Sequence, residues 1–388
     1  MAILRQNKDM KRLSCIFMLL FLLSLTACGA EVSGAELARE EARRAADVYA
    51  PIMRADAGAD LDAIYSRLAG AGYAVQDETG ERDFANPGVI TGFMQGVDAG
   101  GTDGVGFVRL CSDGGIIYTR LYHDGAAWHC ATARITWENG AAREGFCTDY
   151  ALTCLELTDK CSLIYTCDIP NNTAADKYDG RAAMGKHDGY IDPTTILRLS
   201  PADPALKALE EYIRRTGYNY NNLFTADWDG EDAHALCLND IFLSLWYAEH
   251  GVYISYFNNP YPAYEGTMLS LVPGNEFEAL IMKYLPLEAG DIRALAAYDE
   301  AAQAYPIAIS GPHNGADTPT PEAVAYSANA DGSVSITVDA VFLERATDRA
   351  FTHVVTVMPG EDGGFKYLSN RVIHTGNDIF PEYTSNFN

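Results

Sequence analysis

Residues 115–153, GIIYTRLYHDGAAWHCATARITWENGAAREGFCTDYALT, decide the fold because strand-like runs alternate there with tight-turn dipeptides. The runs are rich in Tyr, Ile and Thr, which favour strands. Asp113-Gly114 precedes this stretch, and Asp124-Gly125 and Asn139-Gly140 interrupt it. Such dipeptides adopt the positive φ that two-residue hairpins require. The pattern predicts an antiparallel meander, with strands near residues 104–111, 115–123, 127–137, 142–153 and 161–168.

Helices are expected before this meander. Ser33-Gly34-Ala35-Glu36 has the spacing of a capping box, with serine followed by glutamate three residues later. The apolar spacing that follows predicts one helix to about residue 54 and a second over residues 59–69.

The second half of the chain repeats the order of helices followed by strands. Asp203 and Pro204 are suited to begin a helix, which Gly217 would end, and further helices are expected over 234–250 and 275–285. We expect Phe242 and Trp246, on one face of the 234–250 helix, to be buried against the final meander. Strands are predicted at 303–309, 323–329, 333–344, 350–358 and 364–373, with a hairpin turn at Asp331-Gly332.

These patterns predict an α+β protein built from two units, each with helices followed by an antiparallel meander. The order is similar to that of curled, cone-like sheets of the nuclear-transport-factor-like or cystatin-like kind, a resemblance that implies no activity. The expected division is a signal peptide at 1–27, an α+β domain at 28–168, a connector at 169–199 and a second α+β domain at 200–388.

The beginning of the chain has the composition of an export signal. Four basic residues precede an apolar run over residues 13–25, which is too short to span a bilayer comfortably. Leu25-Thr26-Ala27-Cys28 follows it and resembles the lipobox of bacterial lipoproteins. The resemblance implies that Cys28 becomes a lipidated N-terminus, anchored at the extracytoplasmic face of the cell membrane. The alternative is an ordinary secretory signal with an incidental cysteine.

Charge limits the partners that the chain can bind. Removing the leader's four basic residues and one acidic residue from the totals of 28 and 53 leaves 24 basic and 52 acidic residues. Nucleic acids and anionic lipid surfaces require a basic face, so neither is an expected partner. The apolar content of 48% is enough to form buried cores.

Seven cysteines follow Cys28, and their state is left open by the sequence. Export permits disulfides, yet buried free thiols acting as small apolar side chains fit equally well. No Cys-x-x-Cys pair is present, so a zinc site is not expected. The first six allow fifteen pairings, and the odd total leaves at least one unpaired: Cys111, Cys130, Cys147, Cys154, Cys161, Cys167 and Cys237.

One acidic cluster is a candidate calcium site. It contains Asp227, Asp229, Glu231 and Asp232, and carboxylate oxygens are the ligands that calcium prefers. An EF-hand loop has glycine at its sixth position and glutamate at its twelfth, whereas here glycine is fourth and Leu238 is twelfth. The alternative is a solvated turn in which Asp232 helps to cap the next helix, so we expect no metal.

No catalytic residue is assigned from the sequence. His123-Asp124-Gly125 and His187-Asp188-Gly189 place histidine beside aspartate, but adjacent residues on a strand point to opposite faces. The chain contains no nucleophile elbow, zinc-protease, P-loop or dinucleotide fingerprint, so no cofactor is expected. A hydrolase acting on cell-wall or nutrient polymers remains the alternative to a non-catalytic protein.

Two loops combine aromatic rings with amides, as ligand-binding surfaces often do. The first spans residues 219–222, and the second contains Tyr256, Asn258, Asn259, Tyr261 and Tyr264. We expect the second loop to bind a glycan, peptide or protein, with the tyrosines stacking and the asparagines hydrogen-bonding at the rim. The alternative is that the tyrosines pack the loop onto the core.

Three segments, LCLNDIFLSLWYAEHG, YFNNPYPAYEG and EDGGFKYLSNRVI, resemble a family of uncharacterised lipoproteins from anaerobic Gram-positive bacteria. The resemblance covers roughly residues 200–375 together with the lipobox, and it implies α+β architecture and lipid anchoring but no chemistry. The sequence therefore predicts a membrane-anchored extracytoplasmic lipoprotein that acts as a non-catalytic binding or assembly module.

Overall fold

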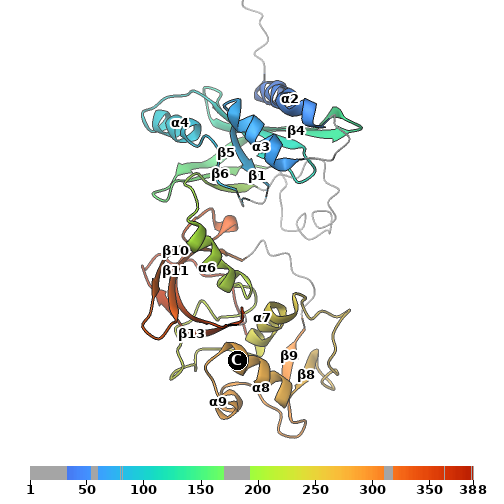
Figure 1. Cartoon of the computed structure of the whole chain (residues 1–388), viewed down its shortest axis with the longest axis vertical. Coiled ribbons are helices and arrows are strands. Elements are labelled where there is room, and N and C mark those ends of the chain that lie inside the picture. Colours follow the sequence, from blue (N-terminus) through green and yellow to red (C-terminus); the bar gives the residue numbers. More distant parts are fainter. Residues whose placement is uncertain are drawn as a thin grey trace, which may run out of the picture.

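The computed structural model describes residues 33–53, 60–78, 80, 82–169, 193–309, 318–361, 363–385 and 387. The leader, Cys28 and His187 lie outside the described residues. The fold is mixed α+β, with one curled half-barrel sheet and smaller antiparallel sheets (Figure 1). None of the helices in the described ranges has the length and apolar character needed to cross a membrane.

The N-terminal half is built on a seven-stranded sheet whose strands follow chain order. Its strands are β1 (Ala74–Asp77), β2 (Val105–Leu110), β3 (Ile116–His123), β4 (Trp128–Glu138), β5 (Ala141–Leu157), β6 (Ser162–Cys167) and β7 (Thr194–Arg198). The predicted meander is confirmed as β2 to β6, and Asn139 and Gly140 both have positive φ. β1, which pairs with β2 in parallel, was not predicted.

A change of partner along β5 explains the curl of the sheet. Residues 141–151 of this strand pair with β4, whereas residues 152–157 pair with β6 after a register shift. Irregularities of this kind bend a strand and increase its twist. β7 pairs with β6, so the prediction that the connector extends through residue 199 is wrong for residues 194–198, which belong to this sheet.

Helices cover both faces of the curled sheet. α2 (Gly34–Met53) and α3 (Leu61–Gly70) pack on one face, and α4 (Gly88–Asp98) packs on the other. The capping box is confirmed, because the Glu36 amide donates to Ser33 Oγ and the Ser33 amide donates to Glu36 Oε2, both at 3.2 Å. α4 was not predicted, because its glycines give it the composition of a loop.

In the described residues, the C-terminal half contains four α-helices, a two-stranded sheet and a four-stranded meander. The first part comprises α6 (Pro204–Arg214), α7 (Leu238–His250), β8 (Leu269–Pro273), α8 (Gly274–Tyr284), α9 (Ala289–Leu295) and β9 (Ala304–Ala308). The meander comprises β10 (Thr320–Ala328), β11 (Val334–Val341), β12 (Thr352–Pro359) and β13 (Phe365–Ile373). The hairpin at Asp331-Gly332 is confirmed, with Gly332 at φ +88.

The packing of α7 follows the sequence prediction only in part. Its main contacts are with α8 and β9, and its buried residues belong to the same hydrophobic core as those of the final meander. Phe242 is fully buried and stacks on Phe277, with ring centroids 4.9 Å apart. The prediction that both side chains are buried is confirmed for Phe242 and wrong for Trp246, which is only partly buried at the edge of this core. Instead it contacts Tyr261 and His250.

A buried lysine joins the two halves. Lys160 lies in the turn between β5 and β6, and its Nζ is 2.9 Å from Asp339 Oδ2 and 2.5 Å from Glu322 Oε2 in the C-terminal meander. Nζ also donates to the Asp348 carbonyl oxygen at 2.9 Å. These contacts, together with a 2.6 Å hydrogen bond from Thr158 Oγ1 to Asp348 Oδ2, fix one half against the other.

Candidate functional site

The loop between α7 and β8, residues 251–268, is held in shape by its own asparagines. α7 ends at His250, and the following Gly251, with a φ of +69, turns the chain away from the helix. Asn258 Oδ1 accepts from the Ser255 amide at 2.6 Å, and Asn258 Nδ2 donates to the Tyr253 carbonyl at 2.8 Å. Asn259 Nδ2 donates to Ser270 Oγ at 2.8 Å. Both amide groups therefore hold the loop together, where the sequence had led us to expect rim contacts to a ligand.

The three tyrosines of this loop have different surroundings. Tyr261 is buried, and its hydroxyl donates to Glu276 Oε1 at 2.6 Å. Burial and this hydrogen bond raise the pKa of Tyr261. The Tyr264 hydroxyl donates to Asp299 Oδ2 at 2.6 Å, while the Tyr256 ring is 59% exposed. Two of the rings thus fasten the loop to the protein, and one faces solvent.

Large apolar side chains are exposed along the same loop. Phe257 is 93% exposed and Met268 is 81% exposed, the two highest values among the exposed large apolar side chains of the described residues. Three further side chains are more than half exposed, and we call the set of five the aromatic tip: Val252, Tyr253, Tyr256, Phe257 and Met268. Tyr253 stacks on Tyr247 with centroids 4.0 Å apart, which restrains its ring. Scattered exposed apolar residues are ordinary, but a group on one loop indicates an interaction surface.

The other predicted loop, residues 219–222, has a structural role. Asn221 is buried, and its Nδ2 donates to Ser244 Oγ on α7 at 3.0 Å. Asn222 Oδ1 accepts from the Cys237 amide at 3.1 Å, just before α7 begins. The predicted start of this helix at residue 234 is therefore four residues early, because residues 234–237 form turns held by Asn222.

The acidic cluster at residues 227–232 stabilises turns. Asp229 Oδ1 accepts from the Glu231 and Asp232 amides at 2.8 and 2.9 Å, and these bonds lower the pKa of Asp229. Asp227 Oδ1 accepts from the Val372 amide, and Asp232 Oδ1 from the His234 amide. Across the residues that the structure describes, no group of three or more His, Cys, Asp or Glu side chains is arranged to hold a metal ion.

A histidine that the sequence reasoning missed lies between two carboxylates. His129 Nε2 is 3.1 Å from Asp124 Oδ2, and His129 Nδ1 is 3.3 Å from Asp149 Oδ1. Tyr122 stacks on His129 and donates to Asp149 Oδ2 at 2.7 Å. His123 instead accepts from the Gly125 amide at 3.0 Å, as part of the turn. The predicted hairpin could have indicated this cluster, because its register places Tyr122 opposite His129.

The seven cysteines that follow Cys28 are free thiols in the structure. Cys161 is exposed, Cys147 and Cys154 are partly buried, and the remaining four are buried. Burial raises the pKa of the Cys111 thiol to about 11, which disfavours the reactive thiolate. The Cys237 thiol donates to Asp240 Oδ2 at 3.2 Å and the Cys147 thiol to the Ala35 carbonyl oxygen at 3.2 Å, and among the described residues no thiol is hydrogen-bonded to a histidine.

Comparison with known proteins identifies a family. No curated protein and no solved structure matches the chain. Residues 35–386, which include the curled sheet, the aromatic tip and the C-terminal meander, match the model described as "Family of unknown function (DUF6070)". Because this match spans nearly all of the sequence, the chain belongs to the DUF6070 family.

Proposed function

We propose that this chain is a lipid-anchored extracytoplasmic lipoprotein that acts as a non-catalytic binding or assembly module and docks a protein partner through the aromatic tip. The observation that carries the proposal is the exposure of five large apolar side chains on one loop, with Phe257 exposed to 93%. Burial of these exposed apolar side chains by a partner is favourable, because it removes apolar surface from water.

The loop is preorganised for binding. The Asn258 and Asn259 amides and the buried Tyr261 fix its backbone, and Pro260 restricts it further. A surface that is already ordered loses less conformational entropy on association than a flexible one. The exposed rings of Tyr256 and Phe257 therefore stand on a fixed base, as anchor residues at protein interfaces do.

A protein is the class of partner that best fits this surface. A glycan site needs polar groups beside its aromatic rings, and here the amides of Asn258 and Asn259 are used inside the loop. An anionic membrane is disfavoured by the formal net charge of −25. Phe257 projects outward, so its complement is an apolar pocket on another protein.

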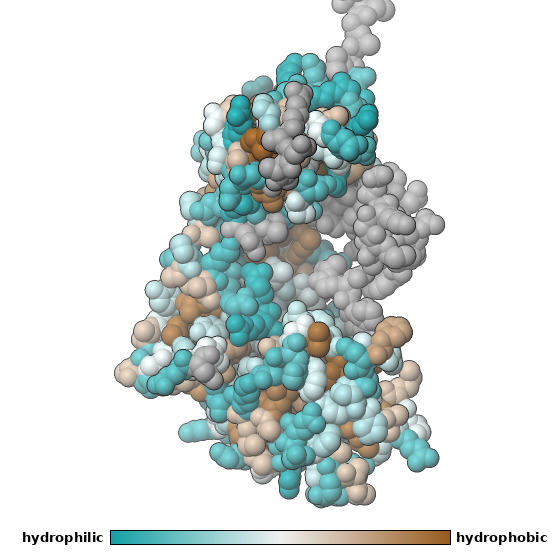
Figure 2. All heavy atoms as spheres, turned by 45° about the vertical axis from the view of Figure 1, so that its right-hand side comes forward, coloured by the Kyte–Doolittle hydropathy of each residue, from teal (hydrophilic) through white to brown (hydrophobic). Residues whose placement is uncertain are grey.

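The position of the aromatic tip supports a partner away from the membrane. Ser33, where the described chain begins, lies only five positions after Cys28, so a lipid on Cys28 would keep α2 near the bilayer. Figure 1 shows α2 at one end of the long axis and α7, β8 and β9 towards the other. In Figure 2 apolar residues are interspersed with polar ones on the surface of this C-terminal part.

Two finer assignments belong to the same proposal. One is that the family consists of lipoproteins of anaerobic Gram-positive bacteria, which rests on the lipobox at Cys28 and the resembling segments. The other is that the curled sheet is related to the cone-like nuclear-transport-factor-like or cystatin-like folds, which rests on the order of elements. The alternative of a hydrolase acting on cell-wall or nutrient polymers has no observation in its favour among the described residues.

Site-specific photo-crosslinking on intact cells tests the proposal. A photoreactive phenylalanine analogue at Phe257 should give one discrete adduct, and the same analogue at Tyr326, 51% exposed on β10, should not. Replacing Tyr253 and Tyr256 with serine should abolish the adduct while the protein stays folded, because both rings are exposed. No adduct at Phe257, or equal adducts at both positions, would overturn the assignment.

A further inference from the structure

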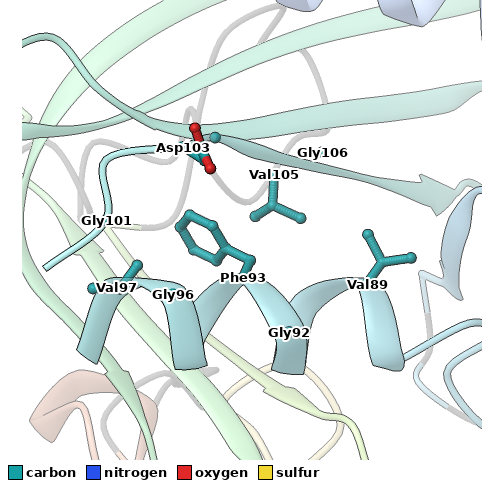
Figure 3. A pocket seen from close by; sticks show the side chains of 10 residues that line it. Val89, Gly92, Phe93, Gly96, Val97, Gly101, Asp103, Val105 and Gly106 are labelled. Atoms are coloured by element: carbon teal, nitrogen blue, oxygen red, sulfur yellow. The ribbon is translucent and has the colours of Figure 1, made fainter. Parts of the chain in front are cut away.

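A groove in the N-terminal half lies between α4 and the chain that leads into β2 (Figure 3). Its volume is about 350 Å³, at the lower end of the range for ligand sites. Val89, Phe93 and Val97 line it from the helix, and Asp103 and Val105 line it from the opposite wall. In Figure 3 the Phe93 ring and the Val105 side chain point into the space between helix and strand, and Asp103 lies beside the Phe93 ring on the strand side.

One wall of the groove is an open strand edge. β3 pairs with β2 along its whole length, from Val105 to Leu110. On the other edge β1 pairs only with residues 107–110, so among the described residues no strand lies beside residues 103–106 on that edge. An uncovered edge is a template for another strand, because its backbone groups can extend the hydrogen-bond ladder.

The helix wall leaves room for a second backbone. Apart from neighbouring residues and the nearby backbone of α4 itself, no described heavy atom lies within 4 Å of the position that a Cβ would take at Gly92 or Gly96. An incoming chain can therefore approach the α4 backbone closely between Phe93 and Val97. The Gly101 amide donates to the Gly96 carbonyl at 2.8 Å, which holds the end of the groove in place.

We propose that this groove binds an extended peptide segment of a partner protein, which adds as a strand along residues 103–106. Addition of a strand to a sheet edge gives affinity through the main chain, and a pocket for alternate side chains gives specificity. An apolar side chain of the peptide would contact Phe93 and Val105. A basic side chain would lie near the exposed Asp103, as the acidic charge of the whole chain also favours.

This proposal is independent of the aromatic tip, which lies in the other half of the chain. The probe is a fluorescein-labelled peptide of alternating lysine and valine, measured by fluorescence anisotropy against the whole mature protein. Two control peptides keep its length: one replaces lysine with glutamate, and the other keeps the lysines but replaces valine with proline. We expect only the lysine–valine peptide to bind, because proline lacks the amide that a strand donates.

A matched pair of variants locates the binding. Gly92→Leu fills the groove and should weaken binding roughly tenfold or more, whereas Gly88→Leu should not change it. Gly88 also has open space around its Cβ position and lies on the same helix, but it does not line the groove. Asp103→Asn should lower affinity for the lysine–valine peptide, and bound peptide should slow hydrogen exchange of amides at 104–106. Equal binding of the proline peptide, or an unchanged affinity in Gly92→Leu, would overturn the proposal.

Discussion

Replacing Lys160 with methionine should loosen the attachment between the two halves of the protein. The Lys160 side chain is only 12% exposed, and its ammonium group contacts the carboxylates of Glu322 and Asp339. The Asp339 side chain is 4% exposed. Methionine preserves most of the packing of the lysine chain but removes its charge, its ion pair with Glu322 and its hydrogen bonds to Asp339 and to the Asp348 carbonyl oxygen.

The size of the effect follows from the groups left behind. Removing one partner of a buried ion pair costs about 3–5 kcal/mol, because the other charge stays buried without compensation. Here Asp339 would keep Arg349 at 3.2 Å and the Thr352 hydroxyl at 2.7 Å, and Glu322 would keep Arg198 at 3.5 Å. We therefore expect the lower end of that range, about 3 kcal/mol.

The loss should also depend on pH. Burial by itself would raise the pKa of Asp339, but the hydrogen bond and charge of Lys160, with further donors, outweigh burial and lower it. A carboxyl with a lowered pKa stabilises the fold above its unfolded pKa and loses that effect as the pH falls. The difference between wild type and Lys160→Met should therefore shrink below about pH 4.

Urea unfolding followed by tryptophan fluorescence measures the change. Trp128 and Trp137 report on the N-terminal half, and Trp228 and Trp246 report on the C-terminal half. The control is Lys283→Met, which removes an exposed bridge to Glu249 and should cost less than about 1 kcal/mol. If Lys160→Met unfolds with the same midpoint as Lys283→Met, the junction does not stabilise the protein as we have argued.

Cys28→Ala should move the protein from the membrane fraction to the medium or leave it as unprocessed precursor; membrane association of correctly processed variant would contradict lipidation. His353 is buried and its pKa is lowered to about 4 by burial, so it stays neutral in the folded state while the unfolded chain takes up a proton below about pH 6.5. Unfolding free energy should thus fall by about 2 kcal/mol between pH 7 and pH 5, and His353→Gln should remove most of that slope in urea titrations. Phe242→Ala should cost about 3–5 kcal/mol because the ring is fully buried. Trp246→Ala should cost clearly less, since Trp246 is only partly buried, and equal thermal shifts in the two variants would contradict this distinction.

Local signals in the sequence predicted most of the elements correctly. Asn139-Gly140 and Asp331-Gly332 form the expected turns, with positive φ at Asn139, Gly140 and Gly332. These turns are predictable because asparagine and glycine adopt positive φ at little cost wherever they stand in a chain. Asp203 caps α6 through its side chain, as its type and position indicate. The predicted strands of both meanders were found for the same reason, since alternation of apolar side chains is visible within a few residues.

The features that escaped prediction depend on distant contacts. β1 is four residues long and is a strand only because β2 lies beside it. α4 contains glycines that disfavour an isolated helix, yet Ile90 and Met94 bury it against the sheet. Tyr261 is buried and Tyr256 is exposed partly because Glu276 on α8 accepts a hydrogen bond from the Tyr261 hydroxyl. The sequence around the two tyrosines does not contain this information. The sequence therefore predicted which loop carries the exposed rings, but not which of its rings are exposed.

The Lys160 junction gives the two proposed sites a common physical consequence. The groove beside α4 belongs to the N-terminal half and the aromatic tip to the C-terminal half, so the junction fixes the distance between them. A partner that occupies one site then meets the other at a high effective concentration, provided that its own surfaces match this spacing. Such a partner would lose affinity when the spacing becomes variable, even though each site remains intact. Lys160→Met should accordingly lower the affinity of a partner that contacts both sites more than it lowers the affinity of the lysine–valine peptide, which contacts the groove alone.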